Sequence, residues 1–156
     1  MRHHRILVTA VAAAWLWTTP SVGAVSQGET ARLTVRQSDT YGPYLTDATG
    51  RALYLFTADQ PGHGGTPAAS QCYQGCAEAW PPLLALQPQA GDQVEASYLG
   101  TMQRNDGGIQ VTYQGWPLYY YTRDTGPGTT TGQGVSSFGG GWYLVNPQGQ
   151  KIEKKP

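Results

Sequence analysis

The chain has 156 residues, with ten basic and ten acidic side chains, so its formal net charge is zero. This length suits one ordinary domain with a single core, and no cluster of Lys and Arg accompanies the aromatic residues, which argues against a nucleic acid as partner. Few charges combined with 21 Gly, 11 Pro and ten Tyr are typical of a compact all-β protein with many turns.

The N-terminal segment, residues 1–24, is expected to be a cleaved signal peptide. Arg2 and Arg5 give it a positive start, an apolar run follows, and residues 22–24 offer a small-residue cleavage site. The apolar run is shorter than the about 20 residues that a membrane-spanning helix needs. We therefore expect a mature chain that begins near Val25, is periplasmic or extracellular, and has no stable membrane anchor.

Strand patterns dominate the first half of the remaining sequence. The alternating "ARLTVR" at residues 31–36 predicts one strand in the N-terminal segment 25–40. "DATG" at residues 47–50 predicts a hairpin connection in which Gly50 is free to adopt a positive φ. The next strand, "RALYLF", is apolar on both faces, so we expect other parts of the domain to cover both of its sides.

The second half repeats this plan with other residues. "TMQR" and "IQVTY" flank the turn "NDGG", and "QG" at residues 114–115 joins the second of these strands to "WPLYYY". A last hairpin is predicted in "WYLVNPQGQKIE", where Pro147 and Gly149 stand at the positions that a tight turn favours.

One phrase occurs twice. "YLFTAD" at residues 54–59 recurs as "YYYTRD" at residues 119–124, and each copy runs into a Gly/Pro loop and then reaches a Trp, Trp80 or Trp142. Two such units are too few for a solenoid, which needs about three repeats or more. They predict instead two halves of one small β fold that share a core.

The predicted fold class is therefore all-β. We expect a small antiparallel β fold, a hairpin meander that is sandwich- or barrel-like, with at most one short helical turn around residues 72–80. The two-repeat domain is predicted to cover residues 41–156, with repeat 1 at about 41–90 and repeat 2 at about 98–153.

The order of the motifs resembles a known family. The two phrases, "CYQGCAEAWPPL" between them and "GQGVSSFGGGWYLVNPQG" after them are similar to the secreted-repeat family, also described as predicted lipoproteins with a Yx(FWY)xxD motif. The resemblance covers about residues 41–149 and implies an exported, envelope-associated bacterial protein without implying a biochemical role. Unlike the lipoprotein members, this chain has no Cys near the predicted cleavage site that could be acylated.

The aromatic residues of the phrase fall on one side of a strand. Tyr54 and Phe56 point the same way in the first copy, as do Tyr119 and Tyr121 in the second. Aromatic residues at this spacing are good cross-strand packing partners, which favours a structural role. A ligand site built twice is the alternative.

The phrase ends in a carboxylate in both copies. Asp59 and Asp124 each open a Gly/Pro turn and can accept backbone N–H groups there. Because Pro61 has no N–H, Asp59 is expected to use Gly62 or a neighbour. Internal symmetry could also pair the two carboxyls as in a glycosidase, but we expect both to be solvated with ordinary pKa values.

Cys72 and Cys76 are the only cysteines. In an exported chain such a pair favours a disulfide. A regular helix holds the Cβ atoms of residues i and i+4 about 5–6 Å apart, whereas a disulfide needs about 3.5–4.5 Å. We therefore expect a tight turn or a distorted helix, for which Gly75 supplies the freedom. A redox-active pair and thiolate metal ligation are the alternatives.

His63 is the only His outside the predicted signal peptide. Metal sites that need two or three His from one chain are thereby excluded. In its Gly-rich loop His63 is expected to be solvated, and a weak metal site with Asp59 or with the Cys pair is its only candidate role. No cofactor is expected, and no phosphate-binding Gly loop is present, because "FGGGW" leads into strand residues.

We expect an exported, non-catalytic module of the cell envelope with a binding or structural role, whose partner is an envelope protein or a small ligand. One alternative is a redox or metal-handling accessory protein that uses Cys72, Cys76 and His63. A second alternative is carbohydrate binding through exposed aromatic side chains. The candidate binding aromatics are Trp80, Trp116, Tyr120 and Trp142.

Overall fold

The structure, a computed structural model, describes residues 28–153. The predicted signal peptide, residues 1–24, lies outside the described residues, as do residues 25–27 and 154–156. Within residues 28–153, no helix has the length and the apolar character that crossing a membrane requires.

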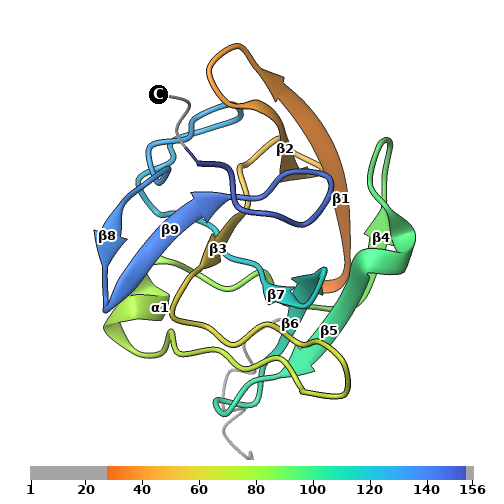
Figure 1. The fold of residues 1–156 in the computed structure, drawn as a ribbon, viewed down its shortest axis with the longest axis vertical. Helices are drawn as coiled ribbons and strands as arrows, with labels where there is room; N and C mark the ends of the chain where they lie inside the picture. Colours follow the sequence, from red (N-terminus) through yellow and green to blue (C-terminus); the bar gives the residue numbers. More distant parts are fainter. Residues whose placement is uncertain (1–27, 154–156) are drawn as a thin grey trace, which may run out of the picture.

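Three small three-stranded sheets make up the fold, so the all-β prediction is confirmed. Figure 1 shows β3 near the middle of the view, β8 and β9 to its left, and β5, β6 and β7 at the lower right. The sheets are formed by β1 (Gly28–Ser38), β2 (Gly42–Asp47) and β4 (Ala85–Ala90); by β3 (Tyr54–Phe56), β8 (Ser136–Ser137) and β9 (Gly140–Leu144); and by β5 (Leu99–Gln103), β6 (Ile109–Tyr113) and β7 (Trp116–Pro117). The helical segments are α1 (Gly75–Ala79) and a single 3-10 turn, η1 (Ala96–Tyr98).

One strand pair differs from the expected antiparallel pattern. β1 pairs with β2 in antiparallel fashion but with β4 in parallel, so that Leu33 faces Asp47 on one side and Ala90 on the other. A parallel pair needs a long crossover connection. Here the chain passes through β2, β3 and α1 before it returns as β4, and a pattern of hairpins gives no sign of that return.

The predicted hairpin turns are present. Gly50 has a φ of +84°, and its N–H donates to the Asp47 carbonyl at 3.0 Å. Gln114 and Gly115, both with positive φ, form the turn between β6 and β7. At the C-terminal hairpin the Asn146 N–H donates to the Gln150 carbonyl at 2.9 Å.

β3 lies between two hydrophobic clusters, as its apolar sequence predicts. On one face Tyr54 and Phe56 belong to the aromatic cluster that also holds Trp80 and Trp142. On the other face Leu53 and Leu55 belong to an aliphatic cluster, whose other members include Leu33, Leu45, Val111 and Leu118. All four side chains of this stretch are at most 1% exposed. The core therefore covers β3 on both sides.

The two repeats meet at the doubled phrase. Tyr54 and Tyr119 are antiparallel partners, and each backbone N–H donates to the other residue's carbonyl, at 2.9 and 3.0 Å. The strand segment of the second phrase thus lies beside β3, which carries the first. This pairing brings the corresponding side chains of the two copies into one core.

Candidate functional site

The four aromatic rings of the doubled phrase are core residues. Tyr54, Phe56 and Tyr119 are 0% exposed, and Tyr121 is 8% exposed. The prediction that these rings are buried is confirmed. A ligand site built twice would need the same rings in an open cleft, so the phrase does not form one.

The tyrosine of each copy bonds to the aspartate of the other copy. The Tyr54 hydroxyl donates to Oδ2 of Asp124 at 2.6 Å, and the Tyr119 hydroxyl donates to Oδ2 of Asp59 at 2.7 Å. All four residues are buried. Each copy therefore completes the hydrogen bonding of the other, which explains why the phrase occurs twice in one domain.

The second oxygen of each carboxylate holds its own loop, as expected. Oδ1 of Asp59 accepts the Gln71 N–H at 2.7 Å, and Oδ1 of Asp124 accepts the Thr131 N–H at 2.8 Å. The expectation that Asp59 bonds to Gly62 or a neighbour is wrong. The loop after Asp59 folds back through the pairing of its two ends, and this brings a donor from the far end of the loop to the carboxylate.

A column of four stacked rings fills the aromatic cluster. Phe56 stacks on Trp142, Trp142 on Trp80, and Trp80 on Tyr121, with ring centroids 4.1, 4.0 and 3.9 Å apart. Gly140 passes beneath Phe56, where a Cβ would lie 2.7 Å from the ring. The glycines of "FGGGW" thus allow the backbone to approach the column closely.

A buried polar chain runs from Asp59 to an arginine. Ser70 Oγ and the Tyr119 hydroxyl oxygen are hydrogen-bonded at 2.7 Å, and Arg104 donates from Nη1 to Ser70 Oγ at 3.1 Å. Arg104 is 2% exposed and forms an ion pair with Asp106 at 2.8 Å. Its position at the end of "TMQR" gave no sign of burial, because a single Arg after a strand is normally solvated.

Asp59 is not a solvated carboxyl. It is 5% exposed, and burial raises its pKa from 3.8 to about 6, although the Gln71 N–H, the Tyr119 hydroxyl and Arg104 all lower it. The expectation of an ordinary pKa is wrong for this residue because its turn lies inside the domain. Asp124 is also buried, at 8% exposed. Both carboxylates are occupied by internal donors, so the geometry does not support a glycosidase pair.

Cys72 and Cys76 form the predicted disulfide, with their Cα atoms 5.2 Å apart. Cys76 lies in α1, a helix of five residues, and its N–H donates to the Tyr73 carbonyl, as in a tight turn. The two cysteines are 0% and 6% exposed and pack in the aromatic cluster with Trp80. Burial leaves an external thiol little access to this bond.

His63 is exposed in its loop, as expected. Among the described residues no group of three or more His, Cys, Asp or Glu side chains is placed to hold a metal ion. His63 borders surface pockets, whereas Cys72 and Cys76 lie in the core. The geometry therefore gives no support to a shared metal site of these three residues.

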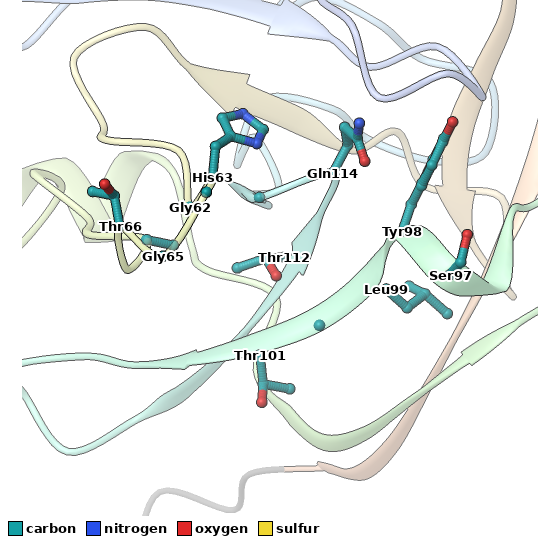
Figure 2. A pocket seen from close by; sticks show the side chains of 14 residues that line it. Gly62, His63, Gly65, Thr66, Ser97, Tyr98, Leu99, Thr101, Thr112 and Gln114 are labelled. Carbon is teal, nitrogen blue, oxygen red and sulfur yellow. The ribbon is translucent and has the colours of Figure 1, made fainter.

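Two open pockets lie side by side at the loop that carries His63. Their volumes are about 390 and 510 Å³, and His63 and Gln114 line both of them. We call the two pockets together the Gln114 groove. Figure 2 shows the smaller pocket, with the side chains of His63 and Gln114 at the same end. Thr66 and Thr112 belong to the wall of this pocket, and Trp116 and Gln148 to that of the larger one.

Close backbone contacts hold three loops together at Gln114. The Gly62 N–H donates to the Gly115 carbonyl at 3.0 Å, and a Cβ on Gly115 would clash with the Gly62 backbone. A Cβ on Gly149 would clash with the side chain of Gln114, and the φ of Gly149 is +76°. Glycine at these contacts therefore fixes where the groove lies.

The four aromatics proposed for ligand binding occupy different places. Trp80 and Trp142 are 1% and 0% exposed, so their candidacy as exposed binding aromatics is wrong: the stacked column needs both rings. Tyr120 is half-buried, donates to Asp47 and lies under the Arg51 guanidinium. Trp116 alone of the four lines the Gln114 groove.

Gln114 is the groove residue that the sequence did not single out. The dipeptide "QG" predicts a turn and nothing more. Only the tertiary structure indicates that Gln114 belongs to a candidate site. Gln114 has a positive φ of 47°, and two glycines from other loops contact its turn.

Comparison with known proteins identifies the family of this domain. No curated protein and no solved structure matches the chain significantly. The profile of the Lipoprotein_15 family, described as a secreted repeat of unknown function, matches residues 35–84 and 100–146. These segments make up more than half of the chain, and each contains a hairpin that leads into one copy of the doubled phrase. The chain therefore belongs to the Lipoprotein_15 family of secreted repeats and carries two copies of the repeat.

Proposed function

We propose that the mature chain is a non-catalytic binding module of the bacterial cell envelope, and that the Gln114 groove is its binding surface. One observation carries this proposal: the reactive groups of the repeated motifs are occupied inside the domain, whereas the groove has polar groups without internal partners. Asp59, Asp124 and the disulfide are buried. Catalysis at the surface would have to do without them.

The groove offers groups that can bond to a partner. The side-chain amides of Gln114 and Gln148 and the indole N–H of Trp116 have no hydrogen bond to any other residue in the described range 28–153. Free donors and acceptors beside an aromatic ring are typical of small-molecule and recognition sites. They support binding rather than a purely structural role.

Retention on envelope material tests the proposal. The purified mature chain is mixed with envelope fractions of the bacterium that exports it, and the bound fraction is measured against protein concentration. We expect saturable retention that is lost in the double variant Gln114→Ala/Gln148→Ala. Phe138→Ala is the matched control, since Phe138 is 53% exposed and lies outside the groove. Retention that never saturates, or that both variants keep, would contradict a groove-based binding role.

The compartment is proposed on the same grounds as the signal peptide. Export to the periplasm or beyond predicts that the protein recovered from that compartment begins near Val25. Intact-mass measurement of the exported protein checks this. A retained Met1 or a lipid adduct would contradict the proposed processing.

A further inference from the structure

We propose that the Gln114 groove binds a neutral oligosaccharide. This inference rests on the proposed binding role and names the class of ligand. A sugar ring has one apolar face of C–H groups and a rim of hydroxyls that both donate and accept. Its recognition therefore needs an aromatic surface, neutral groups that donate and accept, and no unmatched charge.

Trp116 supplies the aromatic surface. Among residues 28–153 it is the one Trp that lies outside the stacked column, because Trp80 and Trp142 are both buried there. Trp116 belongs to β7, pairs with Tyr113, and packs partly against the aliphatic cluster. The ring is thus held by the core on one side while it lines the larger pocket. A fixed, half-buried indole loses little conformational entropy when a ligand packs on it.

Gln114 and Gln148 supply the neutral polar groups. A carboxamide offers an acceptor oxygen and two donor hydrogens, which matches hydroxyl groups of either orientation. Both amides are free of internal hydrogen bonds within the described part of the chain. The hydroxyl-bearing side chains of Thr66 and Thr112 extend the same chemistry along the smaller pocket.

The charges around the groove disfavour an ionic ligand. Neither pocket is lined by Asp, Glu or Arg, and the one Lys among the lining residues, Lys151, forms an ion pair with Glu153 at 2.7 Å. This pair carries no net charge, so an anionic ligand gains little from it, whereas a neutral glycan needs no charged partner.

The size of the groove fits several sugar rings. Each pocket, at about 390 or 510 Å³, falls within the range of about 300–1,000 Å³ that is usual for small-molecule sites. His63 and Gln114 form part of both walls. The two pockets therefore adjoin at these two residues, and each can take sugar rings of one oligosaccharide.

Titration with defined tetrasaccharides tests the inference. The tetramer of N-acetylglucosamine and cellotetraose are added separately to the purified mature chain, and Trp fluorescence and binding heat are recorded. Because the other two Trp of the described domain are buried, a change in fluorescence on binding reports on Trp116. We expect saturable binding of at least one tetramer, and a tetragalacturonate, which is acidic, should bind at least about tenfold more weakly.

Three variants locate the site. Trp116→Ala and Gln114→Ala should each weaken tetrasaccharide binding by about tenfold, measured by calorimetry. Phe138→Ala should leave it unchanged. Near-UV circular dichroism, which reports on the stacked Trp80 and Trp142, verifies that every variant is folded.

Two outcomes would overturn the inference. One is an absence of measurable heat with both neutral tetramers at about 1 mM; the other is equal binding by wild type and Trp116→Ala. If the wild type is still retained on envelope fractions in either case, the binding module stands and only the ligand class is wrong. If retention is also absent, the proposed function itself fails.

Discussion

Replacing Asp59 by Asn should make the stability of this domain depend differently on pH. The change removes the charge and keeps the shape. The carboxamide oxygen can still accept the Gln71 N–H, which now bonds to Oδ1 at 2.7 Å. Its NH₂ group can donate to the Tyr119 hydroxyl, which is free to donate in turn to Ser70, 2.7 Å away. The buried polar chain therefore remains bonded in the variant.

The magnitude follows from the raised pKa. Burial moves the pKa of Asp59 from 3.8 to about 6 in the folded protein. Between these values the folded state holds a proton that the unfolded state has lost, so the contribution of Asp59 to stability is largest below pH 3.8 and falls as the pH rises to about 6. At about 1.36 kcal/mol per pH unit, the wild type loses about 3 kcal/mol of unfolding free energy over this range. Asp59→Asn has no such loss.

Urea unfolding at several pH values from about 4 to 7 measures the effect. We expect the unfolding free energy of Asp59→Asn, relative to wild type, to rise by about 2.5 kcal/mol across this range, since part of the full effect lies below pH 4. Asp106→Asn is the matched control, because the bond from Arg104 lowers the pKa of Asp106. The Asp106 carboxylate stabilises the fold above its unfolded-state pKa of 3.8, and that contribution is lost only as the pH falls below this value. The difference between Asp106→Asn and wild type should therefore stay nearly flat from about pH 4 to 7. A difference between Asp59→Asn and wild type that is flat with pH would refute the reasoning.

Three further changes address the core, the disulfide and the groove. Phe56→Ala removes an end of the stacked column and should cost about 3–5 kcal/mol in denaturant unfolding; a cost below about 1 kcal/mol would contradict its role. Reduction of Cys72–Cys76 opens a loop of sequence separation 4 and should cost only about 2 kcal/mol, measured as a shift in the urea midpoint, and a collapse of the transition would mean that the bond supports more than its own turn. Gly149→Ala places a Cβ against Gln114 at a φ of +76° and should destabilise the domain by about 1–3 kcal/mol while weakening tetrasaccharide binding; unchanged unfolding and binding would contradict the close contact.

Much of the core could be predicted because local patterns determine it. Aromatic residues at i and i+2 and apolar residues between them give a strand buried on both faces, and residues 53–56 are such a strand. The disulfide followed from the number of cysteines and the expected compartment. These inferences depend only on neighbours along the chain.

The partners of the carboxylates could not be predicted from such patterns. Nothing in "YLFTAD" indicates that Asp59 accepts from a tyrosine of the other copy, because that bond depends on how two distant segments approach each other. The same holds for Arg104, whose guanidinium reaches Ser70 and the Cys72 carbonyl. A turn signal gives the local backbone, whereas burial and pKa depend on what the rest of the chain places over that turn.

The groove was missed for a related reason. Its walls include the loop with Gly62 and His63, the turn at Gln114 and the turn at Gly149, and each of these segments alone is an ordinary turn sequence. Only their mutual contacts, at positions where a Cβ would clash, bring them together around one groove. Trp116 could be named as a candidate from its residue type, but not distinguished from Trp80 and Trp142.

The paired residues of the doubled phrase and the Gln114 groove occupy different parts of this domain. The phrase closes the fold, since each tyrosine needs the aspartate of the other copy and each Trp of the column stacks on an aromatic residue of the other repeat. None of the rings or carboxylates of the phrase lines the groove. Under the proposed function, substitutions in the groove can alter ligand binding while the rings and carboxylates of the paired motif stay intact. Recognition of the phrase in a sequence consequently identifies the scaffold, and under the proposed function Gln114, Trp116 and Gln148 determine what the scaffold binds.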